Sequence, residues 1–234
     1  VAAGAKPCAV VATTGTTSTA AVDPVRAIAE IAKKYDCWLH VDAAYAGSAA
    51  VCEENRWIWD GIDSADSIVT NPHKWLFTPI DCSVLYTRRP DVLRETFSLV
   101  PEYLKTTDTA EINYMDYGLQ LGRRFRALKL WLVLEHYGID HLRNVIRDHV
   151  AFAERLASEL RAREDVEVIS QSFSVVVFRL RAGDDATMAL LERMNAAGTL
   201  FVSHTKLRDR YCIRVAIGNG ATEWRHIAQL LVSV

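Results

Sequence analysis

The sequence lacks the cysteine and histidine patterns that hold metals. Neither CxxC nor HExxH occurs in its 234 residues, which argues against a structural zinc site or a zincin, and we predict no metal ligands. The cysteines are odd in number and dispersed, and most lie in apolar runs. We therefore expect small buried hydrophobic residues rather than disulfides, in the reducing environment of the cytoplasm. They are Cys8, Cys37, Cys52, Cys82 and Cys212.

Long apolar runs and a strong charge imbalance are also missing. No apolar run reaches the ~18 residues that a transmembrane helix needs, and residues 1–7 lack the basic and apolar regions of a signal peptide. The formal net charge is −2, so neither a nucleic acid nor a membrane surface is the expected partner. The sequence starts without Met, on what reads as a loop leading into a strand. We expect it to be a fragment of a longer protein.

The first half of the chain alternates strand and helix patterns. A β-prone run at 8–13 is followed by a helix that starts at Asp23-Pro24, with Asp23 as N-cap, and by a strand at 37–42 that ends in Asp42. Strand, helix and strand within ~35 residues predict a βαβ unit and a parallel sheet. Runs at 67–70 and 82–86 extend this sheet. The fold class is therefore α/β.

The pattern changes after residue 95, where no hydrophobic period holds. A stretch of this length in a compact domain favours a mobile lid, at about 97–117. Two helices follow, one at 121–137 with apolar residues nearly all round and one at 140–163 with a stripe at helical spacing. Four strands (166–169, 174–180, 200–202, 211–217), a helix at 184–197 and a final helix capped by Thr222 complete the chain. We predict that 1–137 is part of a large α/β domain and that 138–234 is a small α+β domain.

The most unusual stretch is Asn71-Pro72-His73-Lys74-Trp75, on the loop between two predicted strands. Most lysines are solvated surface charges. One flanked by Asn, Pro, His and Trp is better suited to capture a carbonyl as a Schiff base. Asp42 ends its strand at the same edge of the sheet, beside two alanines that leave room for a flat ring. A strand-end acid and a lysine ~30 residues later suit pyridoxal phosphate, since the lysine binds the aldehyde and the acid keeps the pyridine nitrogen protonated.

Three motifs carry a family resemblance. They are His40-Val41-Asp42-Ala43-Ala44-Tyr45-Ala46-Gly47, the stretch around Lys74, and Leu121-Gly122-Arg123-Arg124-Phe125-Arg126. Together they resemble the group II pyridoxal-dependent decarboxylases, and within them the aromatic-L-amino-acid decarboxylases. The resemblance covers the whole chain but only the C-terminal half of the family. It implies a fold-type-I pyridoxal 5'-phosphate enzyme that converts an aromatic L-amino acid into its amine and carbon dioxide, homodimeric as the full-length protein.

The resemblance also implies residue roles. It makes Lys74 the Schiff-base lysine, Asp42 the partner of the pyridine nitrogen, and Thr17 a cofactor contact. Ala44 would lie against the ring face and Asn71 would contact the phosphate. His73 would contact cofactor or substrate, with a role in loop packing as its alternative.

Two further residues concern the substrate. Tyr103, on the predicted lid, would return a proton to the substrate's α-carbon, which a phenol can do at neutral pH. Relatives with phenylalanine there resemble aldehyde synthases, and a packing tyrosine is the alternative. Gly122 would enlarge the substrate pocket for indole or catechol rings. Two of the arginines at 123, 124 and 126 are expected to pair with buried carboxylates or carbonyls.

Other functions remain open from the sequence. Another fold-type-I enzyme, such as a glutamate-type decarboxylase, an aldehyde synthase or an aminotransferase, would carry similar motifs. A truncated, non-catalytic dimerisation fragment is the alternative from a different class. The family's ring-stacking histidine and its serine-containing phosphate loop are not found in these residues.

Overall fold

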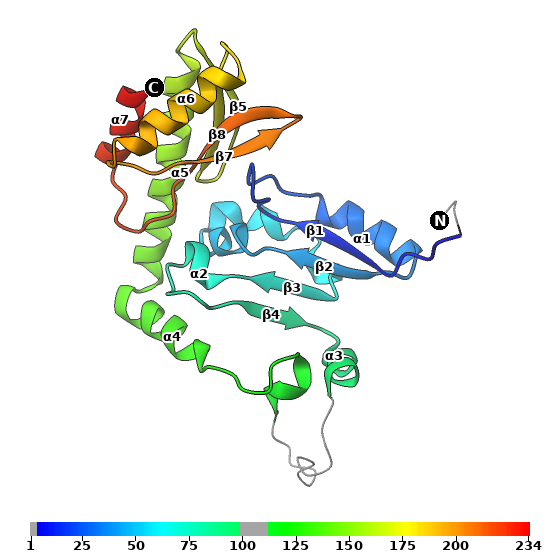
Figure 1. Cartoon of the computed structure of the whole chain (residues 1–234). Coiled ribbons are helices and arrows are strands. Elements are labelled where there is room, and N and C mark those ends of the chain that lie inside the picture. Colours follow the sequence, from blue (N-terminus) through cyan, green and yellow to red (C-terminus); the bar gives the residue numbers. More distant parts are fainter. Residues whose placement is uncertain (1–3, 99–111) are drawn as a thin grey trace.

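The computed structural model describes residues 4–98 and 112–234, so Tyr103 and the middle of the predicted lid lie outside the described residues (Figure 1). The first half of the chain forms a four-stranded sheet in the order β1-β2-β3-β4. Its strands are β1 (Ala9–Thr13), β2 (Trp38–Asp42), β3 (Ser67–Thr70) and β4 (Val84–Thr87). The first three strands are parallel, as predicted.

β4 runs antiparallel to β3, so the sheet is mixed. The run at 82–86 thus extends the sheet, as predicted. The connection between the two strands holds a single helical turn, α2 (Pro72–Trp75). A parallel return usually crosses the sheet through a longer helix. The chain instead turns back at the end of the sheet where α2 lies (Figure 1).

Helix α1 (Val25–Lys34) covers one face of this sheet. Val25, Ala29 and Ala32 are buried in a core with the apolar residues of β1 and β2. Asp23 does not cap the helix, contrary to the prediction, because its carboxylate accepts the Thr13 amide at 2.8 Å. The remaining short elements are η1 (Ala46–Val51), η2 (Glu53–Trp59), η3 (Ile62–Ser64), α3 (Pro90–Phe97) and η5 (Tyr114–Tyr117).

The two helices predicted at 121–137 and 140–163 agree with the structure to different extents. α5 (Ile139–Arg161) buries the predicted stripe in full, from Leu142 to Leu160. α4 (Arg126–Tyr137) starts five residues later than predicted and buries only Val133 among its side chains. The expectation of burial nearly all round is therefore wrong for this chain, where Leu128, Trp131 and Leu132 are exposed.

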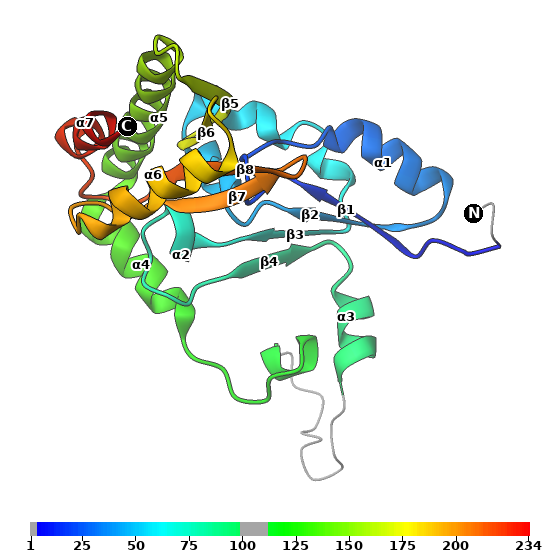
Figure 2. The ribbon, with the colours of Figure 1, turned by 45° about the horizontal axis from the view of Figure 1, so that its top comes forward.

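The second sheet is antiparallel, in the order β5-β6-β8-β7, and α5, α6 and α7 pack against it (Figure 2). Its elements are β5 (Val166–Ser172), β6 (Val175–Leu180), α6 (Asp184–Ala196), β7 (Ser203–Leu207), β8 (Arg210–Ala216) and α7 (Trp224–Ser233). The predicted strand at 200–202 is wrong, since β7 begins at Ser203. Thr222 is not the cap of α7 either. Glu223 caps it in a capping box with His226.

A shared core joins the two sheets. Trp75 from α2, Ile146 from α5 and Phe173 from the β5–β6 turn belong to one buried cluster. Arg143 of α5 also donates to the Val51 carbonyl at 2.7 Å. The proposed division at 137/138 stays a prediction, because α5 packs against both parts. Within the described residues, none of the helices is long and apolar enough to span a bilayer.

The cysteines are all free. Cys52, Cys82 and Cys212 are buried as predicted, and burial raises the pKa of each thiol. Cys8 is exposed and Cys37 half-buried, which corrects the expectation for those two positions.

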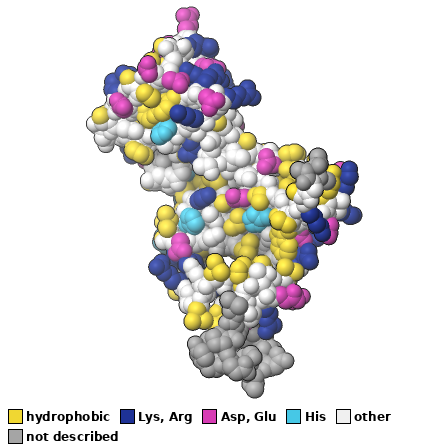
Figure 3. All heavy atoms as spheres, turned by 45° about the vertical axis from the view of Figure 1, so that its right-hand side comes forward, with side chains coloured by type: hydrophobic (Ala, Val, Ile, Leu, Met, Phe, Trp, Pro, Cys, Tyr) yellow, Lys and Arg dark blue, Asp and Glu magenta, His cyan; other side chains and the backbone are white. Residues whose placement is uncertain are grey.

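Apolar side chains reach the surface along one edge of the first sheet. On β4, Leu85 is 50% and Tyr86 59% exposed, and Trp131 on the neighbouring α4 is 55% exposed. Figure 3 shows hydrophobic side chains at the surface in the lower part of the view, between charged ones. In the described part of the chain, β4 also pairs on one side only. A free strand edge with apolar neighbours is a site of association.

We expect the isolated 234-residue chain to self-associate through this edge. Size-exclusion chromatography with light scattering should give a mass above that of the monomer. The double substitution Leu85→Lys/Tyr86→Lys should shift the chain towards the monomer, since charge on an edge strand opposes pairing. Phe201→Lys removes an even more exposed apolar residue elsewhere and should leave the mass unchanged. A monomeric unmodified chain at high concentration would contradict this prediction.

Candidate active site

Three neighbouring strands end at the same edge of the first sheet. The register pairs Thr13 of β1 with Asp42 of β2, and Asp42 with Val69 of β3. Backbone hydrogen bonds continue past the strand ends, from Ala43 to the Val69 carbonyl at 2.9 Å and from Asn71 to the Ala44 carbonyl at 3.1 Å. The segments that carry Thr17, Asp42, Ala44, Asn71 and Lys74 therefore meet at one edge. Carboxyl ends of parallel strands are where α/β proteins bind their ligands.

Asp42 presents a carboxylate that is only partly used by the protein. One oxygen, Oδ1, accepts the Ala44 amide at 3.0 Å, which fixes the orientation of the side chain. The other, Oδ2, has no hydrogen-bond partner among the described residues. Ala43 and Ala44 are buried, and their methyl groups take little space beside the carboxylate. The arrangement leaves one oxygen available to a protonated ring nitrogen.

Lys74 lies in the single helical turn α2, which refines its predicted placement on a loop. Pro72 occupies the first turn, and the Lys74 amide donates to the Asn71 carbonyl at 2.9 Å. Pro72 and Trp75 are buried, whereas the Lys74 side chain is exposed and none of the ion pairs between described residues includes it. The backbone of this turn is thus fixed while its amine is left available.

His73 is held through one ring nitrogen. Its Nδ1 lies 3.0 Å from the amide nitrogen of Cys82 and 2.7 Å from the Cys82 carbonyl oxygen. The tautomer decides which of the two is the hydrogen bond, and either way Nδ1 is occupied. The packing role considered for His73 is therefore present. Its Nε2 has no partner among the described residues.

Asn71 places an unsatisfied amide at the start of α2. Its Oδ1 is buried and has no hydrogen-bond partner among the described residues. Buried polar atoms are rarely left unpaired in native proteins. Rotation of the amide by 180° puts its Nδ2 donor at this position, and a donor is what a phosphate oxygen requires.

Thr17 is exposed, and the second sheet holds its loop. Arg214 of β8 donates from Nε to the Thr17 carbonyl at 2.7 Å. Two more hydrogen bonds join the same loop to this sheet, Ser18 Oγ with Thr205 Oγ1 and Ser172 Oγ to the Ala20 carbonyl, both at 2.9 Å. Sequence reasoning missed Arg214, although an arginine inside the apolar run 211–217 was a usable signal. Its half-buried position lowers the pKa of the guanidinium through desolvation.

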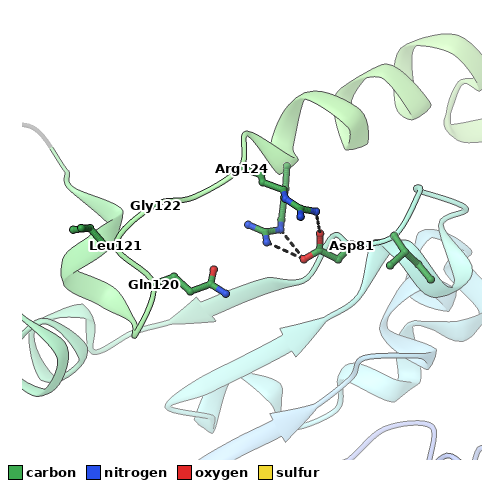
Figure 4. Close-up of a pocket in the computed structure, with 7 residues that line it drawn as sticks. Asp81, Gln120, Leu121, Gly122 and Arg124 are labelled. Carbon is green, nitrogen blue, oxygen red and sulfur yellow. Dashed lines mark hydrogen bonds and ion pairs between the residues drawn. The ribbon is translucent and has the colours of Figure 1, made fainter.

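Gly122 lies in a different hollow, whose lining includes Ile80, Gln120 and the Asp81–Arg126 pair (Figure 4). A side chain at Gly122 would meet no other atom within 4 Å. None of Thr17, Asp42 and Lys74 lines this hollow, so the described chain does not bring Gly122 into their site. Its predicted role in a substrate pocket stays a prediction.

The expected pairing of two arginines near Gly122 is found. Arg126 donates to Asp81 Oδ2 at 2.9 Å, and Arg124 Nη1 lies 3.5 Å from Asp81 Oδ1. The hydrogen bond from Arg126 lowers the pKa of the Asp81 carboxyl. The acid is not buried, in contrast to the prediction, because its side chain is 42% exposed.

The strand-end residues fit pyridoxal phosphate. An exposed lysine amine suits the aldehyde, the available oxygen of Asp42 suits the pyridine nitrogen, and the orphaned amide of Asn71 suits a phosphate oxygen. Small buried alanines between them leave space for a planar ring. The donor set at this edge thus matches the cofactor predicted from the sequence.

We expect Arg214→Met to loosen the Thr17 loop. The substitution removes a charged donor from a backbone carbonyl, and the part-exposed setting limits the loss to about 1 kcal/mol of local opening free energy. Hydrogen exchange at the amides of residues 15–20 should accelerate accordingly. Arg193→Met, at an exposed arginine of α6, serves as the control. Unchanged exchange in this loop would show that Arg214 does not hold it.

Comparison with known proteins agrees with this chemistry. Residues 1–181 match the family model described as the pyridoxal-dependent decarboxylase conserved domain. The chain is 42% identical to tyrosine decarboxylase 4 of Petroselinum crispum, over 96% of this chain and 47% of that protein. It is 41% identical to phenylacetaldehyde synthase of a Rosa hybrid cultivar, over 97% of this chain and 48% of that protein.

A solved structure agrees with the fold. The crystal structure of Oryza sativa TDC with PLP and tryptamine superposes with a TM-score of 0.93 at 40% identity, covering 99% of this chain and 50% of the other. The chain thus spans about half the length of the relatives that it matches. The fold-type-I α/β architecture predicted from the sequence is confirmed. With a family model matched over most of its residues, the chain belongs to the pyridoxal-dependent decarboxylases.

Proposed function

We propose that the protein converts an aromatic L-amino acid into its amine and carbon dioxide, using pyridoxal phosphate. The observation that carries the proposal is the shared strand edge, where the exposed Lys74 and the partly unpaired Asp42 follow neighbouring parallel strands. Relatives support the substrate class, since one is named a tyrosine decarboxylase and a similar structure was solved with tryptamine.

Lys74 and Asp42 would divide the work at the cofactor. When bound, the cofactor supplies an electron sink for the pair of electrons that the departing carboxylate leaves behind. Lys74 would hold the aldehyde of the cofactor through its amine. Asp42 keeps the pyridine nitrogen protonated, with its carboxylate oriented by the Ala44 amide. Asn71 and Thr17 would bind the cofactor from the same edge of the sheet, and Ala44 would leave room for its ring.

Proton transfer to the substrate is assigned to Tyr103, on the strength of the family resemblance. A phenol is protonated at neutral pH and can donate to the α-carbon after carbon dioxide leaves. The free Nε2 of His73 is available to a bound group, because Nδ1 is occupied by the Cys82 backbone.

Specificity and assembly complete the proposal. Gly122 would admit a large ring such as an indole or a catechol. It lines a hollow away from Lys74 in this chain, which suits a homodimer in which one subunit completes the site of the other.

We also propose a cytoplasmic location, from the free cysteines.

An aldehyde synthase is the second candidate. The specific observation in its favour is the 41% identity to a phenylacetaldehyde synthase, close to the 42% to a tyrosine decarboxylase. Such an enzyme consumes oxygen and water and releases aldehyde, carbon dioxide, ammonia and hydrogen peroxide. Tyr103, where aldehyde synthases of the family carry phenylalanine, favours simple decarboxylation.

We expect Lys74→Ala, made in the complete natural protein, to abolish amine production and the visible absorbance of lysine-bound cofactor. Removal of the Lys74 amine takes away the group proposed to hold the aldehyde, and loss of a covalent catalytic group costs activity by several orders of magnitude. Lys206→Ala, at an exposed lysine of β7, is the matched control and should keep both. Retention of the absorbance and of amine release in Lys74→Ala would refute the lysine assignment.

Tyr103→Phe should shift the products towards aldehyde, ammonia and peroxide, because the phenolic proton is then missing when the α-carbon must be protonated. Parallel assays of amine, carbon dioxide, ammonia and peroxide from tyrosine, DOPA and tryptophan measure the shift. Tyr86→Phe, at an exposed tyrosine of β4, should leave the products unchanged. Peroxide from the unmodified protein, at the level of carbon dioxide, would instead identify an aldehyde synthase.

A further inference from the structure

The residue after Lys74 is the most heavily packed side chain of the site. Trp75 is 1% exposed and lies in the core between the two sheets. Its ring stacks on Tyr45 at 4.8 Å with an interplanar angle of 13°, and meets Phe173 edge-on at 6.1 Å. Tyr45 follows Asp42 by three residues. The segments of the lysine and the acid are therefore packed against each other through this pair of rings.

Trp75 is also tied to α5 by a buried hydrogen bond. Its indole Nε1 donates to His149 Nδ1 at 3.1 Å. An indole nitrogen can only donate, so Nδ1 of His149 carries no proton. The other ring nitrogen, Nε2, lies 3.1 Å from the Asn219 carbonyl and donates to it. His149 is thus a neutral imidazole with both nitrogens paired, in agreement with a pKa that desolvation lowers.

A second chain of hydrogen bonds runs beside the first. Ser174 Oγ donates to the Ile217 carbonyl at 2.6 Å, so the Tyr45 hydroxyl, 2.6 Å from the same Oγ, is the donor to Ser174. Burial raises the pKa of Tyr45 to about 12, which keeps this donor protonated. Both chains end at carbonyls of residues 217 and 219, on the segment between β8 and α7.

Helix α2, the single turn that carries Lys74, needs such support. α2 has four residues, and an isolated turn of helix is unstable because its nucleation cost is not repaid. The exposed Lys74 contributes no packing of its own, whereas Trp75 is anchored on three sides. His149 is completely buried and both of its nitrogens are occupied, so it cannot reach a substrate.

We propose that His149 is a positioning residue for Lys74, acting through the Trp75 indole. Its Nδ1 accepts from the Trp75 indole and its Nε2 donates to the Asn219 carbonyl, so it fixes the turn that carries Lys74 to the segment between β8 and α7. This inference rests on the proposed function for its catalytic meaning, while the positioning itself is a property of the chain without cofactor.

The experiment compares four variants of the complete natural protein. His149→Leu removes both hydrogen bonds and fills the buried position with an apolar side chain. His149→Gln keeps an acceptor and a donor and is the rescue variant. Ile146→Ala, one turn earlier on α5 and in the same buried cluster, is the control for a loss of packing alone. Trp75→Phe tests the bond from the other side, since it keeps an aromatic ring and deletes the donor.

Two readouts are measured, and one needs no cofactor. In the cofactor-free protein, hydrogen exchange at the amides of residues 71–76 should be about tenfold faster in His149→Leu and Trp75→Phe, and near the unmodified rate in His149→Gln. Cofactor affinity, from titration of the visible absorbance of lysine-bound pyridoxal phosphate, should fall by about tenfold in the first two variants, a size typical for loss of a residue that orients a ligating group.

The control decides between positioning and general stability. Ile146→Ala should lower the melting temperature without a selective effect on residues 71–76. Equal acceleration in Ile146→Ala and His149→Leu, or no acceleration in His149→Leu, would overturn the inference. If the unmodified protein binds the cofactor but releases no amine, the proposed function fails and the positioning result stands on the exchange data.

Discussion

The structure depends on the parallel alignment of β1, β2 and β3. Their register places Thr13, Asp42 and Val69 side by side, and the backbone bonds from Ala43 and Asn71 carry the alignment past the strand ends. Polar residues that are far apart in the sequence are thereby delivered to one edge. The backbone groups of the strands behind this edge are satisfied by their own ladder, which leaves the following loops free to face a ligand.

Side chains from α5, the β5–β6 turn and β8 hold this edge in place. Arg214 holds the Thr17 loop, Ser174 holds Tyr45 after Asp42, and His149 holds Trp75 after Lys74. Each of the three segments of the site is thus pinned by a polar side chain from beyond residue 138. Buried and satisfied polar networks of this kind specify one arrangement, because a displaced donor or acceptor would be left without a partner. This explains how an exposed lysine in a four-residue helix can have a defined position.

Sequence reasoning succeeded where local pattern and burial agree. The stripe of α5 was predicted residue by residue, and β3 was placed at its observed bounds. It failed where a partner element decides the outcome. α4 has the apolar composition of a buried helix, yet among its side chains the described chain buries only Val133. Asp23 looked like a helix cap, but its carboxylate accepts the Thr13 amide.

By itself, the sequence determined the chemical types of the site: a lysine and an acid after parallel strands, with small residues and an amide between them. The lysine, the acid and the small residues follow from residue type and spacing, whereas the amide was assigned through the family resemblance. Only the tertiary structure decided how those groups are held. The bonds from Arg214 to Thr17 and from Trp75 to His149 join residues 197 and 74 positions apart. Such pairings have no local signal, because they arise only when two sheets pack and bury donors and acceptors that must then be satisfied.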